Sequence, residues 1–247
     1  MKYLLLIAGN TEYSSDGTVA PEALAVMQRE IPRWAGEMDG RGVRLLGREL
    51  DLPRTAATVR VRGGETLVTD GPFAETKEFI AGFNLLECAD RDEAVEVAVK
   101  CPVSWFQTVE IRPFTGGLRL GAQAPAFGRG EDGAATPYAL IMWIGRAPAA
   151  LLEDQAVMAE YDAWQQDLQA RGLHILGNAL GGLDAATTVR VRDGQALLSD
   201  GPFTKITEFI GGIDVVSCAD RQQAIQLAVA HPIAQYHAIE VRPFYKE

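Results

Sequence analysis

The sequence predicts an α+β protein that contains the same domain twice. Residues 58–114 align with residues 188–244 without a gap, and about half of the aligned positions are identical. Within each copy the hydrophobic pattern follows the order β-α-β, hairpin, β-α-β. Two copies are too few for a solenoid, so we interpret the repeat as a duplicated domain.

The opening strand and the first helix of each copy are predicted from apolar spacing. Residues 2–9 form a short apolar run typical of a buried strand. An apolar stripe with helical period follows in both copies, and Gly42 and Gly172 are expected to end these helices. Pro32 lies inside the first stripe, where we expect a kink or a break. The stripes are Leu24, Met27, Ile31, Trp34 and Met38 in the first copy, and Val157, Tyr161, Trp164 and Leu168 in the second.

A hairpin with a two-residue turn is predicted next in each copy. Pairing Arg62 with Glu65 places Val59 opposite Val68, and Asp70 falls on the same face. A carboxylate at the end of an apolar face is costly unless it is hydrogen-bonded or lies at a cavity. We therefore expect Asp70 to face inward. The turn signals are Gly63-Gly64 and Asp193-Gly194.

The second half of each copy contains a strand, a helix and a final strand. Residues 79–87 form the strand in the first copy, and Asp90 is the expected N-cap of a helix over 91–100. Asp220 has the same position before a helix over 221–230. In the final strands, apolar Val109 and Ile111 alternate with Glu110 and Arg112, and Ile239 and Val241 alternate with Glu240 and Arg242.

The domain boundaries follow from the repeat. We expect domains at 1–114 and 138–247, joined by a linker at 115–137 that is rich in Gly, Ala and Pro. Fully extended, such a linker would span about 75 Å. It is therefore long enough for one domain to fold back on the other.

Composition excludes several classes of function. A net charge of −10 with scattered basic residues argues against nucleic-acid binding. No apolar run is long enough to cross a membrane, and the N-terminal run is too short for a signal peptide. Three cysteines indicate a reducing compartment, so we expect a cytoplasmic protein. They are Cys88, Cys101 and Cys218, and we expect small buried side chains.

The segment with the most chemistry is the loop that follows each hairpin. Residues 70–78 read DGPFAETKE, and residues 200–208 read DGPFTKITE. Gly and Pro mark a turn, yet the first loop carries four charged side chains and an aromatic ring. Loops held between strands are common places for binding groups.

These motifs resemble those of the DGPFAETKE family, a branch of the YCII-related proteins. The resemblance rests on residues 70–78 and extends to residues 2–7, 58–62 and 109–114. It implies two ferredoxin-like β-α-β-β-α-β domains with an inserted hairpin. Their sheets would pair into an α/β barrel of the dimeric type, which here would be an intramolecular pseudo-dimer.

The resemblance implies a fold more than a reaction. YCII-related proteins are thought to use a His and an Asp in a cleft, and a few distant ones are lyases or isomerases. This sequence departs from the Asp-Pro that follows the second helix in such proteins, because it has Cys101 and His231 before the proline. Some relatives are encoded beside extracytoplasmic-function sigma factors, which suggests a sigma factor as a partner.

Two interpretations of the loop residues are open. Asp70, Glu75 and Lys77 form a candidate acid–base set, if burial shifts a pKa toward neutrality. Alternatively, Asp70 caps backbone amides of its own loop, and the other charges are solvated. Glu75 and Lys77 are replaced by Lys205 and Thr207 in the second copy, so the first copy is the expected working site. Candidate ligand-binding residues are Phe73, Glu78, Arg60, Arg112, Asp200 and Phe203, for which core packing and cross-strand ion pairs are the alternatives.

Two functions from different classes are consistent with the sequence. The first is a small-molecule binding protein, or a cofactor-independent enzyme of the lyase or isomerase kind, with its cleft at the Asp70 loop. The second is a non-catalytic interaction module in a sigma-factor circuit. We expect no metal, since His174, His231 and His237 lack metal-ligand spacing, and we expect no cofactor. Further homo-oligomerisation is left open.

Overall fold

The chain forms two compact units, each of which combines segments from both sequence copies. The structure is a computed structural model that describes residues 1–10, 21–73, 78–130, 134–145, 154–203 and 208–246. Unit 1 consists of Met1–Glu49, Thr76–Phe114 and Gly181–Lys205, and unit 2 of Leu50–Glu75, Thr115–Leu180 and Ile206–Glu247.

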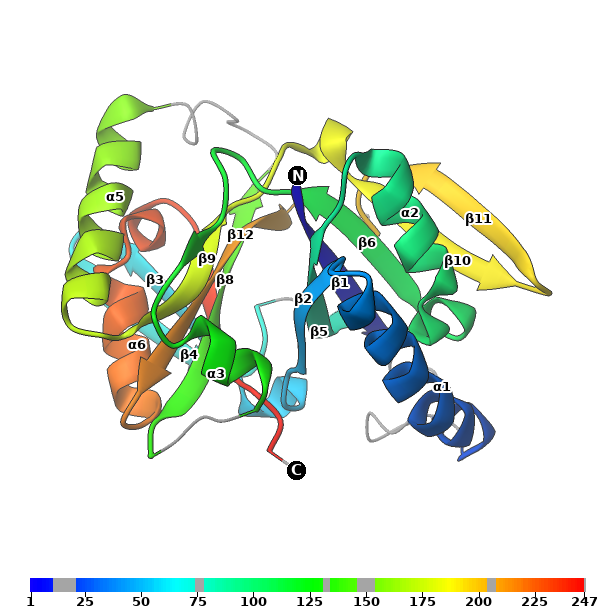
Figure 1. The fold of residues 1–247 in the computed structure, drawn as a ribbon. Helices are drawn as coiled ribbons and strands as arrows, with labels where there is room; N and C mark the ends of the chain where they lie inside the picture. The colour runs from blue at the N-terminus through cyan, green and yellow to red at the C-terminus, as the bar shows by residue number, and fades with distance from the viewer. Residues whose placement is uncertain (11–20, 74–77, 131–133, 146–153, 204–207, 247) are drawn as a thin grey trace. The chain divides into compact units, whose positions relative to one another are not determined.

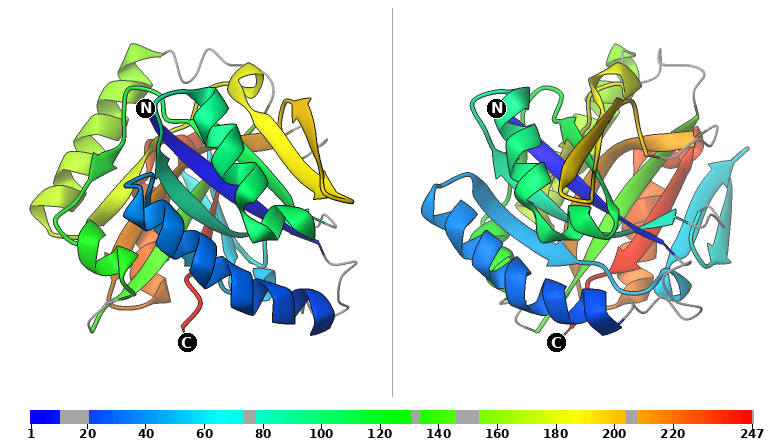
Figure 2. Two further views of the ribbon diagram at one scale, coloured as in Figure 1. Left: turned by 45° about the vertical axis from the view of Figure 1, so that its right-hand side comes forward. Right: turned by 90° about the vertical axis from the view of Figure 1, so that its right-hand side faces the viewer.

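Unit 1 is a six-stranded antiparallel sheet with two helices on one face (Figures 1 and 2). The strand order is β11-β10-β6-β1-β5-β2. Its core packs apolar residues of α1 and α2 against β1, β5, β6 and β10. The elements are β1 (Lys2–Asn10), α1 (Pro21–Gly40), β2 (Arg44–Glu49), β5 (Glu78–Glu87), α2 (Arg91–Lys100), the 3-10 helix η3 (Pro102–Trp105), β6 (Thr108–Pro113), the 3-10 helix η4 (Leu183–Ala185), β10 (Thr187–Arg192) and β11 (Gln195–Asp200).

Unit 2 has the same plan with one additional edge strand. The strand order is β4-β3-β13-β8-β12-β9-β7, and helices α5 and α6 pack on the sheet (Figure 1). The elements are the 3-10 helix η2 (Pro53–Thr55), β3 (Ala57–Arg62), β4 (Glu65–Asp70), β7 (Arg119–Leu120), α3 (Ala124–Gly128), β8 (Thr136–Gly145), α5 (Gln155–Ala170), β9 (His174–Ala179), β12 (Glu208–Cys218), α6 (Arg221–Ala230), the 3-10 helix η5 (Pro232–Gln235) and β13 (Ala238–Pro243).

The predicted ferredoxin-like α+β class is confirmed, as are its local signals. The side chain of Asp90 accepts the N–H of Glu93, and Asp220 accepts the N–H of Gln223. Arg62 pairs with Glu65 in the predicted hairpin register. The stripe of the second long helix is fully buried, whereas in the first helix Leu24 is exposed and Ile31 is half-buried.

The hairpins are exchanged between the two sheets. Strand β10 pairs with β6, so that Val189 lies opposite Val109, and β3 pairs with β13, so that Val59 lies opposite Ile239. Each hairpin therefore covers the edge of the sheet built from the other copy. An isolated two-stranded hairpin is only marginally stable in water, and an open sheet edge has unpaired backbone groups. Pairing each hairpin with the sheet edge stabilises the hairpin and satisfies the backbone groups of that edge.

Two local expectations need correction. Helix α1 runs continuously through Pro32, whose side chain is exposed, so the expected break does not occur. The segment 115–137 is not a plain linker, because its strand β7 pairs with β9. Phe127 of α3 is buried and lies edge-on to Phe244, with ring centroids 4.9 Å apart. This apolar contact packs α3 against Phe244 of the same unit.

Candidate functional site

Asp70 is exposed and belongs to an ion pair. It ends the edge strand β4, its side chain is 87% exposed, and its Oδ1 lies 2.7 Å from an Nη2 of Arg221 in the first turn of α6. The expectation that Asp70 faces inward is wrong, because all of β4 is solvent-exposed. Asp200 makes the equivalent 2.7 Å pair with Arg91 and is 88% exposed. Both aspartates thus tie a hairpin to a helix.

The rest of the motif is fixed by backbone hydrogen bonds. Gly71 has a φ of +100°, which favours glycine, and its N–H donates to the carbonyl of Ala56 at 2.9 Å. Two residues later, the N–H of Phe73 donates to Oε2 of Glu240 at 3.1 Å. The same contact joins the N–H of Phe203 to Glu110 at 2.9 Å. The motif therefore docks each loop on a glutamate of the sheet that receives the hairpin.

These glutamates are buried beside buried arginines. Arg112 contacts Glu110 at 3.0 Å, and its Nε donates to the carbonyl of Gly181 at 3.0 Å. Burial raises the pKa of Glu110, although Arg112 and the N–H of Phe203 act in the opposite direction. Arg242 pairs with Glu240 in the same way. The structure thus places Arg112 in the core, in an ion pair with Glu110 of its own strand β6 rather than in the cross-strand pair that was the alternative to ligand binding.

Phe73 and Arg60 converge at a cavity of about 270 Å³ in unit 2. The guanidinium carbon of Arg60 lies 5.0 Å from the centroid of the Phe73 ring. The Phe73 ring in turn stacks on Trp143, with centroids 5.3 Å apart and planes at 27°. Trp143 is held in place because its Nε1 donates to Glu240 at 3.1 Å. Two aromatic rings and one cation therefore line the same small cavity.

His237, Arg62 and Glu208 complete the charged and polar side chains that line this Phe73 cavity. The N–H of Gly145 donates to Nδ1 of His237 at 3.3 Å, which leaves the proton of the neutral ring on Nε2. Burial, helped by Arg62, lowers the pKa of His237 and favours this neutral form. Arg62 itself donates to three carbonyls of η5 and the residue after it: Ala234, Gln235 and Tyr236.

The corresponding place in unit 1 is differently equipped. Phe203 is buried, and Arg190 donates to the hydroxyl of Thr108 at 2.6 Å. Ala8 stands where unit 2 has Trp143, and Gln107 stands where unit 2 has His237. The stacked pair and the imidazole are thus features of the Phe73 side alone. Glu75, Lys77 and Ile206 lie outside the described residues, and Glu78 begins β5 opposite Asn10.

A second polar group, which we did not expect from the sequence, is buried in unit 2 around Asp214. Its carboxylate accepts the hydroxyl of Tyr161 at 3.0 and 3.1 Å and the amide of Gln165 at 2.9 Å. The Nε2 atoms of His174 and His231 lie 3.7 and 3.5 Å from its two oxygens. Burial alone would raise the pKa of Asp214, but the two histidines outweigh it and hold the pKa at about 2.

Two histidines of this Asp214 cluster are buried side chains of the core. His231 also caps η5, because its Nδ1 accepts the N–H of Ile233. Strand β12 is buried along nearly its whole length, so one signal in its sequence could have revealed the cluster: a charged residue, Asp214, inside an apolar run. In the first copy the cluster is replaced by Asn84, Arg44 and Cys101, and Arg44 donates to Asn84 at 2.9 Å.

Comparison with known proteins identifies the family. The YCII-related domain matches residues 1–115 and 139–246, which is nearly all of the chain. The chain belongs to the YCII-related family. A protein of Rhizobium meliloti (strain 1021), described as uncharacterized, is 58% identical over 48 residues, which are 19% of this chain and 39% of that protein. A crystal structure of a putative chlorite dismutase covers 99% of this chain and 94% of its own, with a TM-score of 0.41 and 7% identity.

Within this YCII-related chain, a His and an Asp do meet, although not in an open cleft. Asp214, His174 and His231 are fully buried. The N–H of Ile233 donates to Nδ1 of His231, so Nε2 is the ring nitrogen that can present an N–H toward Asp214. The carboxylate is therefore surrounded by donors, an arrangement that stabilises a buried anion.

The described residues also bear on metal binding, membrane insertion and cysteine reactivity. Among the residues described, no three His, Cys, Asp or Glu side chains are arranged to hold a metal ion. No described helix is long and apolar enough to cross a membrane. The three cysteines are buried and free, as expected, and burial raises the pKa of Cys101 to about 12.

Proposed function

We propose that this YCII-related protein binds a small anionic molecule, and that the Phe73 cavity is its site. The observation that carries the proposal is the position of Arg60, which lies over the Phe73 ring and has no ion pair among the described residues. A guanidinium on an aromatic face is a common recognition element for carboxylates and planar anions. At about 270 Å³ the cavity suits a compact ligand.

The hydrogen bonds of His237 and Glu240 favour binding over catalysis by these two groups. Nδ1 of His237 already accepts a hydrogen bond, and the oxygens of Glu240 accept from Trp143, Phe73 and Arg242. Neither group is therefore available as a base. A cofactor-independent reaction of the lyase or isomerase kind would depend on Glu208, a carboxylate of the cavity lining, or on Glu75 and Lys77, which lie two and four residues after Phe73.

The experiment is a thermal-shift screen of small carboxylates and phosphates, followed by calorimetric titration of each hit. We expect Arg60→Ala to weaken binding by about tenfold or more, since it removes the charge above the ring. Arg190→Ala is the matched control, because the equivalent arginine is hydrogen-bonded to Thr108. Equal loss in both variants, or no loss in Arg60→Ala, would contradict the proposed site.

A separate pair of variants tests catalysis. Once a ligand is known, Glu75→Gln and Lys77→Met are expected to abolish turnover while leaving the affinity nearly unchanged. If the wild-type protein binds the ligand and mass spectrometry detects no product, the protein is a binding protein and the catalytic hypothesis is wrong.

A further inference from the structure

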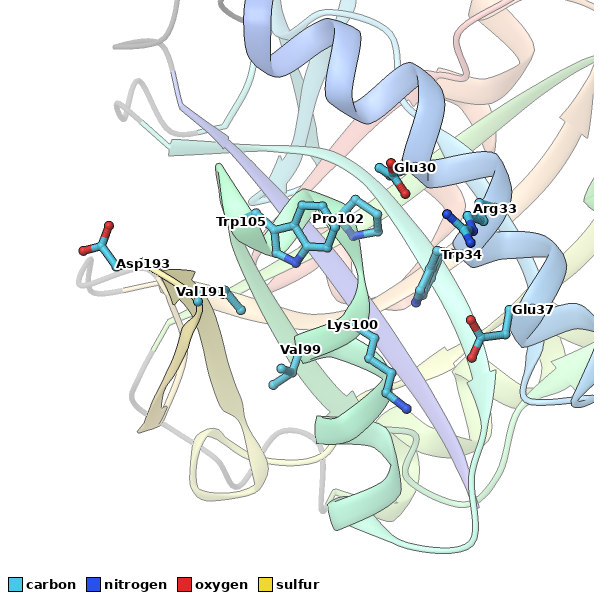
Figure 3. Close-up of a pocket in the computed structure, with 11 residues that line it drawn as sticks. Glu30, Arg33, Trp34, Glu37, Val99, Lys100, Pro102, Trp105, Val191 and Asp193 are labelled. Atoms are coloured by element: carbon cyan, nitrogen blue, oxygen red, sulfur yellow. The ribbon is translucent and has the colours of Figure 1, made fainter.

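Unit 1 contains a larger cavity that is separate from the Phe73 cavity. It has a volume of about 770 Å³ and lies between α1, the end of α2, η3 and the tip of the β10–β11 hairpin (Figure 3). Trp34 and Arg33 of α1 lie on one side, and Pro102 and Trp105 lie on the other. Cavities of this size hold a ligand with one or two rings.

The duplication shows which lining residues belong to the scaffold. At the corresponding place in unit 2 the glutamate, tryptophan and proline of the lining recur as Glu160, Trp164 and Pro232. Residues shared by both copies are explained by the common fold. The side chains that differ are therefore the informative ones.

Apart from Glu37, which corresponds to Asp167, four differences give the unit 1 cavity a distinct chemistry. Arg33 corresponds to Ala163, Lys100 to Ala230, Trp105 to Gln235, and Asp193 to Gly63. Unit 1 thus has two cations, one indole and one carboxylate where unit 2 has two methyl groups, an amide and a glycine. The two cations and the indole are the groups that bind an anion attached to an aromatic ring.

The two cations of the cavity are available to a ligand. The lining also contains three carboxylates, Glu30, Glu37 and Asp193, of which Glu30 is paired with Arg29 at 2.7 Å. Arg33 has no ion pair among the described residues. Lys100 pairs with Glu96 on the surface of α2, with both side chains about half exposed. Exposed pairs of this kind contribute little, so Lys100 is easily redirected to a ligand.

The two tryptophans also differ between the copies. Trp164 donates its Nε1 to the carbonyl of Leu227 at 3.3 Å. Trp34 is buried and lines the cavity, but no described residue accepts its Nε1. Because a buried donor without an acceptor is costly, a ligand with an acceptor at this place would be favoured.

We propose that the cavity between Trp34 and Trp105 is a second ligand site, specific for planar aromatic carboxylates. The ring packs on the exposed indole of Trp105 and on Pro102, and the carboxylate contacts Arg33 or Lys100. This site is independent of the Phe73 cavity, since the two share no lining residue.

The test uses 1-naphthoate as the probe and 1-naphthamide as its neutral counterpart. Both are titrated by calorimetry into the full chain carrying Arg60→Ala, so that the Phe73 cavity does not contribute. We expect one molecule of 1-naphthoate to bind, and the amide to bind about tenfold more weakly or less. Equal binding of the amide would overturn the carboxylate specificity, and no binding of either would overturn the site.

Each variant of unit 1 replaces a lining residue by the residue at the equivalent position of unit 2. Arg33→Ala, Lys100→Ala and Trp105→Gln place the residues of unit 2 at exposed positions of unit 1, so the fold is expected to persist. The triple variant is expected to lose the probe, with an unchanged melting temperature. The reverse graft, Ala163→Arg with Ala230→Lys and Gln235→Trp, is expected to add a second binding event. Binding that survives the triple variant would show that the probe sits elsewhere.

Discussion

At the scale of single residues, the repeated DGPF motif is explained by contacts of the scaffold. The aspartate pairs with the first arginine of a helix, the glycine adopts a positive φ, and the phenylalanine N–H reaches a buried glutamate. These contacts recur with Asp200 and Phe203. Folding alone can therefore explain why the motif occurs in both copies. The ring of Phe73 and the guanidinium of Arg60 are the groups that line the Phe73 cavity in addition to these scaffold contacts.

Replacing Asp70 tests this division. Asp70→Asn is expected to lower the free energy of unfolding by only about 0.5 kcal/mol, because the Asp70–Arg221 pair is solvent-exposed. Urea denaturation measures the change, and Asp200→Asn is the matched control with the same geometry. Ligand binding is expected to be unchanged. Loss of ligand binding at unchanged stability would instead support the functional role of Asp70 that was considered from the sequence.

At the scale of elements, the buried Asp214 cluster ties helix α5 to the sheet of unit 2. Tyr161 and Gln165 of α5 reach Asp214 on β12, and His174 reaches it from β9. The folded-state pKa of Asp214, about 2, lies below the ordinary 3.8. The ionised form therefore stabilises the fold, and this contribution is complete above the unfolded-state pKa and is lost as the pH falls through the folded-state value.

The lowered pKa of Asp214 determines how the stability of unit 2 changes at low pH. Between about pH 4 and pH 2 the protein is expected to lose about 2 kcal/mol through Asp214 alone. Asp214→Asn is expected to lower stability at pH 7 and to flatten the acid limb of the stability curve. Urea denaturation from pH 7 to pH 2 measures both effects. An acid limb that stays as steep in the variant would assign the pH dependence to other carboxylates.

A glycine beside the cluster offers a steric test. A Cβ on Gly177 would lie 2.2 Å from Oδ1 of Asp214 and 2.6 Å from the carbonyl of Ile213, and the residue has a φ of +157°. Gly177→Ala is therefore expected to destabilise the fold by about 2 kcal/mol or more. Gly36→Ala in helix α1 is the control, since a Cβ there meets nothing within 4 Å and alanine favours a helix. Thermal unfolding of the two variants should shift in opposite directions.

Sequence reasoning was most successful where the signal is local. The N-caps Asp90 and Asp220 and the hairpin pairing of Arg62 with Glu65 depend on neighbours along the chain, and they are confirmed. The sheet partner of each hairpin could not be derived, because β3 is as compatible with β6 as with β13 in pattern. The Phe73 cavity was half predicted: Phe73 and Arg60 were named, but Trp143 and His237 come from the other copy and share no local motif with them.

At the scale of the whole molecule, neither unit can be assigned to one half of the chain. Unit 1 needs 181–205 from the second copy, and unit 2 needs 50–75 from the first. The linker expected at 115–137 is likewise part of a sheet, through β7. Two domains that look separable in the sequence are thus joined by exchanged strands.

Cleavage of the backbone is the direct test. A protease site inserted after Gly130 is expected to yield two fragments that co-elute in gel filtration and separate only in denaturant. Each fragment expressed alone is expected to aggregate or to remain partly unfolded, because its sheet would lack the hairpin at β6 or β13. Two stable, monomeric fragments would contradict the exchanged topology.

The exchange of hairpins also has a consequence for synthesis on the ribosome. The edge of β6 is complete once Pro113 has been made, but its partner β10 begins only at Thr187. At roughly 5–20 residues per second, the nascent first copy must wait several seconds with that edge open. During this interval the open edge of β6 can pair with other nascent chains. A chaperone, or the β3–β4 hairpin of the same chain, could occupy the edge until β10 is made. The early hairpin would then have to leave its first partner before the finished chain reaches its final strand order.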